Sequence, residues 1–188
     1  GFSSISEKLS PQALATMLNE YFTQTNAVIS RFGGVITQFE GDAMLITFNA
    51  VTPDADHALN AVRTALAIQE LSENRVYSFG GKLKTRCGIN TGEIVIGAIG
   101  SENRLTFTVH GDNVNIAARL EGMNKQYGSY ILATESTVRA CGDHADIPNW
   151  ISRGEVTMRG RETPTRIFGI APPQPRHAGT TQTTPQQA

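Results

Sequence analysis

The chain has 188 residues, which is enough for one domain with a sizeable core and a tail. Hydrophobic residues make up 39% of the chain and charged residues 18%, as in ordinary soluble globular domains. The formal net charge of −1 gives no general reason to expect nucleic acid or an acidic membrane surface as a partner, so an anionic ligand would be held by a few well-placed cations and backbone amides.

The first element that the sequence predicts is an amphipathic helix. Ser10 and Pro11 have the residue types of an N-cap and a first helical position. Apolar residues then recur at helical spacing from Leu14 to Phe32, and the pair Gly33-Gly34 ends the pattern.

A β-hairpin and a second helix are expected next. Two short apolar stretches, 35–39 and 43–48, flank Glu40-Gly41-Asp42, which predicts antiparallel strands joined by a tight turn. The second helix should begin near Pro53-Asp54 and end near Leu71.

The second half of the chain alternates strands and helices. We expect a helix over 112–124 and a short one over 134–140, with Thr134 as its N-cap. Strands are expected at 82–90, 93–99, 104–110, 130–133, near 155–158 and at 165–170.

This order of elements predicts an α+β fold. A split βαβ, ferredoxin-like sheet with helices on one face fits it, and the first strand of such a sheet would precede Gly1. Residues 1–170 would form the domain. Residues 171–188 are rich in Pro, Gln and Thr with little apolar content, which predicts a disordered tail.

Asp42, at the tip of the expected hairpin, is the first candidate site residue. A Gly-Asp pair is common turn chemistry, which is the simpler interpretation for an isolated hairpin. The functional alternative is that a carboxylate on a rigid hairpin holds Mg²⁺ against a phosphate.

Asn115 and Arg119 are the next candidates, because residues four apart share one face of a helix. An amide, a guanidinium and a helix N-terminus on one patch suit the ribose and phosphate oxygens of a nucleotide. A solvated Asn–Arg pair is the simpler alternative.

Two further cations are less distinctive. Arg159 belongs to the turn between the last two expected strands, where it would reach over a ligand or form a basic surface turn. Arg86 begins an otherwise apolar strand, where it would bind a ligand or extend its aliphatic stem to solvent.

Several other classes of site and location are disfavoured. The four histidines lack metal-binding spacing, and neither a Gly-x-Ser-x-Gly nucleophile turn nor a Gly-x-x-x-x-Gly-Lys phosphate loop occurs. Cys87 and Cys141 form no zinc or disulfide pattern, which indicates reduced cysteines of a cytoplasmic protein. The chain has no signal peptide and no apolar stretch of the roughly 20 residues that span a bilayer, so any membrane attachment would lie in domains outside it.

Six segments together resemble the class III adenylate/guanylate cyclase catalytic domain up to about Gly169. In chain order they read GFSSISE from Gly1, FEGDAMLITF from Phe39, DADHALNAVRTAL from Asp54, RCGINTGEIVIGAIG from Arg86, TVHGDNVNIAARLE from Thr108 and VTMRGRETPTRIFGI from Val156.

The resemblance implies a homodimer of head-to-tail domains with active sites at the interface. It implies that two Mg²⁺ or Mn²⁺ ions assist attack of the ribose 3′-hydroxyl on the α-phosphorus, which forms a 3′,5′-cyclic nucleotide and pyrophosphate.

The resemblance also implies roles for individual residues. Asp42 corresponds to the second metal-binding aspartate, Asn115 to the asparagine that orients the ribose, and Arg119 to the arginine that stabilises charge on the α-phosphate. In that electrostatic role one donor often stabilises the transition state by ~3 kcal/mol. Arg86 corresponds to an arginine that contacts the phosphates from the metal-bearing side.

Three positions depart from the family pattern. The first metal aspartate would lie upstream of Gly1, and Arg159 replaces a phosphate-binding lysine with a cation of different geometry. Gln38 replaces the base-selecting lysine or glutamate, and its partner position holds Thr108. The Gln38 amide could donate to adenine N1 while Thr108 accepts from the 6-amino group, or it could rotate and accept from guanine N1–H.

ATP is therefore the expected substrate and GTP the alternative. A function of another class, a nucleotide-binding or dimerising regulatory module with weak turnover, is suggested by Gln38 and by the aspartate expected upstream. Retention of Asn115 and Arg119 argues against it, because a purely structural module has no evident need for both.

Overall fold

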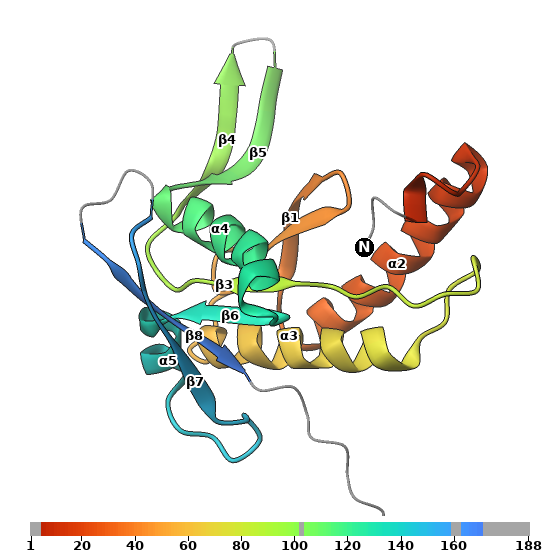
Figure 1. The fold of residues 1–188 in the computed structure, drawn as a ribbon. Helices are drawn as coiled ribbons and strands as arrows, with labels where there is room; N and C mark the ends of the chain where they lie inside the picture. Colours follow the sequence, from red (N-terminus) through yellow and green to blue (C-terminus); the bar gives the residue numbers. More distant parts are fainter. Residues whose placement is uncertain (1–4, 102–103, 159–162, 171–188) are drawn as a thin grey trace, which may run out of the picture.

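The computed structural model describes residues 5–101, 104–158 and 163–170 (Figure 1). Its helices are α2 (Pro11–Arg31), α3 (His57–Asn74), α4 (Asp112–Tyr127) and α5 (Glu135–Cys141). Its strands are β1 (Val35–Glu40), β2 (Ala43–Thr47), β3 (Cys87–Ile89), β4 (Val95–Ser101), β5 (Arg104–His110), β6 (Ile131–Thr134), β7 (Trp150–Val156) and β8 (Thr165–Ile170).

Helix α2 begins and ends where the sequence predicts. The Ser10 hydroxyl accepts a hydrogen bond from the backbone N–H of Ala13 at 3.2 Å, which satisfies one of the free amides of the first turn. After Arg31 the chain turns through Gly33, whose φ of +76° lies in the left-handed region that favours glycine.

A four-stranded sheet with strand order β3-β6-β8-β7 forms the centre of the fold. Strand β3 is parallel to β6, and the other neighbouring strands are antiparallel. The combination of a parallel pair with antiparallel strands and intervening helices agrees with the predicted α+β class.

Helices cover both faces of this sheet, whereas the sequence analysis expected them on one face. Successive strand residues point to opposite faces. In β6, Ile131 packs in a cluster with Leu59 of α3, and Leu132 packs with Leu120 of α4. All four residues of β6 are buried, so its sequence does not alternate between apolar and polar residues.

Two separate hairpins complete the strands. Strands β1 and β2 pair with each other, as do β4 and β5, and the β4–β5 hairpin extends away from the helices (Figure 1). Strand β5 matches its predicted range, and β4 begins two residues later than expected.

The predicted strand 82–90 is reduced to Cys87–Ile89, because β6 pairs only with these three residues. The preceding segment is held by side chains instead. Gln69 donates its amide to the Thr85 carbonyl at 3.0 Å, and the Thr85 and Tyr21 hydroxyls are 3.0 Å apart. Burial raises the pKa of Tyr21 to about 12, so this hydroxyl keeps its proton at neutral pH.

Two other elements begin several residues away from their predicted starts, and α3 and α4 each end three residues later than predicted. Helix α3 begins at His57, because the Asp54 side chain closes the preceding loop by accepting from the Asp56 backbone N–H and from the Asn60 amide, both at 2.9 Å. Strand β7 begins at Trp150, five residues earlier than expected, because pairing with β8 starts there and passes an irregularity between Ser152 and Glu155.

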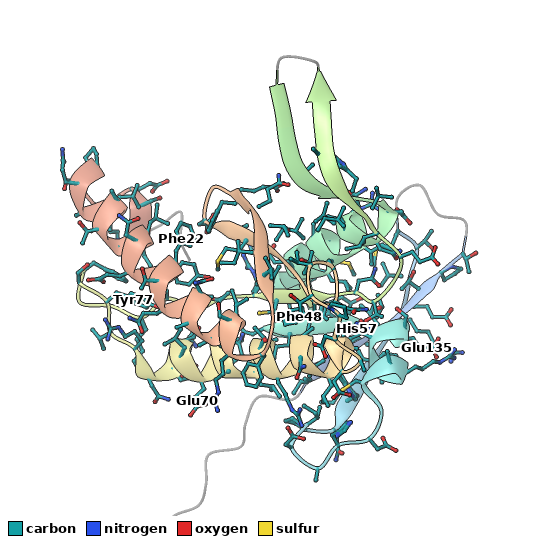
Figure 2. All side chains as sticks on the ribbon, turned by 180° about the vertical axis from the view of Figure 1, so that it is seen from behind. Phe22, Phe48, His57, Glu70, Tyr77 and Glu135 are labelled. Atoms are coloured by element: carbon teal, nitrogen blue, oxygen red, sulfur yellow. The ribbon has the colours of Figure 1, made fainter. Side chains whose placement is uncertain are left out.

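A cluster between α2 and the segment that follows α3 fixes the long N-terminal helix. It contains Met17, Tyr21, Tyr77 and Leu83, with Phe22 packed against them (Figure 2).

None of the helices in the three described ranges is long and apolar enough to cross a membrane. The predicted tail, 171–188, lies outside the described residues.

Candidate functional site

A bulge in β1 determines where Gln38 points. Ile36 pairs with Ile46 but Gln38 pairs with Leu45, so one extra residue, Thr37, is inserted in β1. Because paired residues share a face and Ile46 and Leu45 are neighbours, Gln38 lies on the face opposite to Ile36. Without the bulge these two residues of β1 would share one face.

The predicted base-reading pair is brought together by this arrangement. The Thr108 hydroxyl of β5 donates to Gln38 Oε1 at 3.1 Å, across 70 residues of sequence. Gln38 Nε2 in turn donates to the Glu40 carboxylate at 2.9 Å. Glu40 was not predicted as a site residue, although its position two residues along the strand from Gln38 places both on one face.

Asp42 is exposed at the tip of the β1–β2 hairpin. Gly41, with φ of +64°, makes the turn that presents it. A carboxylate oxygen is a suitable donor for Mg²⁺. Within the described ranges no group of three or more His, Cys, Asp or Glu residues could hold a metal ion, so Asp42 alone does not make a two-ion site.

Helix α4 presents Asn115 and Arg119 on a face that points away from the core. Asn115 is exposed and Arg119 half-buried, whereas the neighbouring Ile116 and Leu120 are buried against the sheet. The two predicted residues therefore share a surface of one helix, as the spacing of four requires.

Polar contacts fix the start of this helix. The Asn113 side chain donates to the Glu93 carbonyl at 2.8 Å and accepts from the Asn90 amide at 2.9 Å. These bonds tie the first turn of α4 to the segment between β3 and β4.

Close packing holds α4 on β3. A Cβ atom on Gly88 would lie 2.1 Å from the Ala117 carbonyl oxygen, so only glycine fits there. The buried Asn124 side chain donates to the Cys87 carbonyl at 3.0 Å and accepts from Ser129 at 2.8 Å. The helix that carries Asn115 and Arg119 is thus rigidly mounted on the central sheet.

Arg86 is joined to the same helix by an ion pair. Its Nε lies 3.0 Å from Glu121 Oε1, with both side chains partly exposed. Sequence reasoning did not identify Glu121, because nothing local in the sequence indicates which strand α4 covers.

The thiol of the adjacent Cys87 has its pKa raised to about 12 by desolvation and then by the Glu121 carboxylate, so it is not a nucleophile at neutral pH.

Two pockets in the described part of the chain are lined by residues other than the predicted ones. One pocket, of about 300 Å³, is lined by polar residues that include Asn90, Asn113 and Arg166, and another, of about 530 Å³, lies beside Asp54 and Asn60. Neither is lined by a predicted site residue. Arg159 lies outside the described residues.

Known proteins are similar to this chain over most of its length. The sequence model of the adenylate and guanylate cyclase catalytic domain matches residues 1–170. A relative named adenylate cyclase 1, from Rhizobium meliloti (strain 1021), is 39% identical over 173 residues, which are 90% of this chain and 26% of that protein. The chain therefore spans about a quarter of the length of that curated relative.

Solved structures agree with the predicted fold type. The guanylyl cyclase Cya2 is 34% identical with a TM-score of 0.73, covering 95% of this chain and 90% of the other. The adenylyl cyclase CyaB from P. aeruginosa is 27% identical with a TM-score of 0.72, covering 95% and 92%. Both likenesses confirm the predicted fold of this chain.

Proposed function

This chain belongs to the adenylate and guanylate cyclase catalytic domain family, and on that premise we propose that it converts ATP into 3′,5′-cyclic AMP and pyrophosphate. The observation that carries the choice of ATP is the hydrogen bond from Thr108 to Gln38. It brings together the two residues that correspond to the family's base-reading positions, although they are far apart in sequence.

The hydrogen-bonding pattern of this pair suits adenine. The Thr108 hydroxyl donates its hydrogen to Gln38, so its oxygen remains as an acceptor for the 6-amino group. The second N–H of the Gln38 amide remains as a donor for ring N1. Adenine presents this combination of a donor at position 6 and an acceptor at position 1.

Asn115 and Arg119 would act on the sugar and the phosphate. From the exposed face of α4 the Asn115 amide would hold the ribose, and the Arg119 guanidinium would stabilise the charge that develops on the α-phosphate as the 3′-oxygen attacks. Arg86 and Arg159 would contact the other phosphate oxygens. The rigid mounting of α4 supports these roles, because orientation of the reacting groups is a large part of catalysis of this kind.

Asp42 would supply one ligand to Mg²⁺ or Mn²⁺, and the other ligands would come from outside the described residues. A bound divalent ion would neutralise triphosphate charge and make the 3′-hydroxyl more acidic. The exposed hairpin tip supports this role, since a carboxylate there is accessible to a nucleotide-bound ion.

The active protein would be a dimer. A triphosphate needs an enclosing site, and the predicted residues of one chain lie on open surfaces rather than in either described pocket. A second copy, related head to tail, would cover α4 with the hairpin that carries Asp42.

Turnover of ATP by the full-length protein with Mn²⁺ tests this proposal. We expect cyclic AMP as the product, and the Arg119→Ala variant should lose about 100- to 1000-fold in kcat, the effect of removing one transition-state donor. Arg139→Ala, an exposed arginine on α5, is the matched control and should keep wild-type turnover. Absence of product from ATP at every protein concentration would contradict the proposal.

GTP is the second candidate substrate, because a guanylyl cyclase is 34% identical to this chain. The same assay with GTP in parallel distinguishes the two. Nucleotide binding without turnover of either, unchanged when Asn115 and Arg119 are replaced by alanine, would instead indicate a regulatory module.

A further inference from the structure

We infer that Glu40 is a positioning residue that holds the Gln38 amide in the orientation that selects adenine over 6-oxopurines. This inference rests on the proposed function, because it concerns the base bound at the same site. It is carried by two hydrogen bonds that link Thr108, Gln38 and Glu40 in series.

The chemistry of the three groups allows only one direction in this series. An ionised carboxylate accepts hydrogen bonds and cannot donate, so the Gln38 group at 2.9 Å from Glu40 must be the NH₂. The amide oxygen then faces Thr108, whose hydroxyl donates to it. Glu40 therefore determines which end of the amide reaches Thr108.

The opposite orientation is the one that a 6-oxopurine needs. Guanine and hypoxanthine present an acceptor, O6, at position 6 and a donor, N1–H, at position 1. Adenine presents a donor at position 6 and an acceptor at position 1. To match them, Thr108 would have to donate to O6 and Gln38 would have to accept from N1–H. Rotating the amide in this way would place its oxygen against the Glu40 carboxylate, where two acceptors face each other without a hydrogen.

The local backbone keeps Glu40 in this position. Gln38 and Glu40 lie on one face of β1, downstream of the bulge at Thr37, and Glu40 pairs with the small residue Ala43 on β2. In the described part of the chain no cation forms an ion pair with Glu40. Its carboxylate is therefore available to the Gln38 amide.

The test compares ATP with inosine 5′-triphosphate, which has O6 and N1–H but lacks the 2-amino group of GTP. In Glu40→Gln, residue 40 can donate as well as accept, so both amide orientations become possible. We expect the ratio of kcat/KM for ATP to that for inosine triphosphate to fall about three- to tenfold, the size expected for one partly exposed, charge-assisted hydrogen bond.

Two further variants separate a positioning role from a general structural one. Glu70→Gln makes the same change of charge on the exposed side of α3 (Figure 2) and should leave the ratio unchanged. In a Gln38→Ala background, Glu40→Gln should have no effect, because the group that it positions is gone. An unchanged ratio in Glu40→Gln, or an equal fall when Gln38 is alanine, would overturn the inference.

Failure of this inference is distinguishable from failure of the proposed function. If the wild-type protein makes no cyclic nucleotide, the proposed activity is wrong. The preference is then measured as the ratio of dissociation constants for ATP and inosine triphosphate, by competition with a fluorescent ATP derivative. The same three- to tenfold fall in Glu40→Gln supports the inference, and no change overturns it.

Discussion

Asn113 and Asn115 lie two residues apart at the start of α4 and have different surroundings. Asn113 is tied to Asn90 and to the Glu93 carbonyl, whereas Asn115 is exposed on the face that also carries Arg119. The spacing of four from Arg119 singles out Asn115 in the sequence, but nothing local in the sequence shows that Asn113 is held by contacts with other segments. Their contacts assign a structural role to one, and the proposed function assigns a catalytic role to the other.

Alanine substitutions should separate the two roles. We expect Asn113→Ala to lower the free energy of unfolding by about 1–3 kcal/mol, because it leaves polar partners unsatisfied. Asn115→Ala should change it by less than about 0.5 kcal/mol while greatly reducing turnover. Urea unfolding beside an ATP assay measures both. Equal destabilisation by the two variants would show that Asn115 is also structural.

The packing of α4 on β3 decides where the proposed catalytic face lies. Gly88 brings the strand backbone against the helix backbone, and the buried Asn124 adds a hydrogen bond to the Cys87 carbonyl. Arg86 reaches the same helix through Glu121. Arg86, which is expected to contact the phosphates from the metal-bearing side, is therefore attached to the same unit of β3 and α4 as Asn115 and Arg119.

Two glycines of this unit should respond oppositely to alanine. Gly88→Ala would place a Cβ atom 2.1 Å from a backbone oxygen and 2.4 Å from a backbone nitrogen, which α4 can relieve only by moving. We expect a loss of about 1–3 kcal/mol or more in unfolding free energy, with loss of turnover.

Gly122→Ala is the matched control on α4. Its Cβ atom would meet nothing within 4 Å, so the higher helix propensity of alanine should raise the unfolding free energy by about 0.5–1 kcal/mol. Urea unfolding of both variants is the measurement. A Gly88→Ala variant as stable as the wild type would contradict the close packing described for α4.

The described elements place the proposed groups on open surfaces. Asp42 lies at the tip of one hairpin, and the β4–β5 hairpin extends away from the helices (Figure 1). This arrangement supports a dimer with two shared sites. In each site one copy would provide Asp42, and the other copy would provide α4 with Asn115 and Arg119.

Complementation between two inactive variants tests the composite site. Asp42→Asn and Arg119→Ala should each be inactive as homodimers. Random pairing after co-expression makes half of the dimers mixed, and each mixed dimer has one intact site, so about a quarter of wild-type turnover should return. Failure to recover turnover from stable mixed dimers would place a whole site in a single chain.

Several features of this protein were predictable from the sequence alone. The Ser10 cap, the hairpin turn at Gly41 and the shared face of Asn115 and Arg119 depend on residues close together in the chain, where capping, turn geometry and helical spacing act directly.

Other features depend on contacts between elements that are distant in the chain. The strand predicted over 82–90 shortens to three residues because its neighbour β6 is short, and helices cover both sheet faces because β6 is apolar on both. The bulge at Thr37 depends on how β1 pairs with β2, and the hydrogen bond between Gln38 and Thr108 joins segments 70 residues apart. Which groups meet across such distances depends on packing between elements, and local propensity acts only within a few residues.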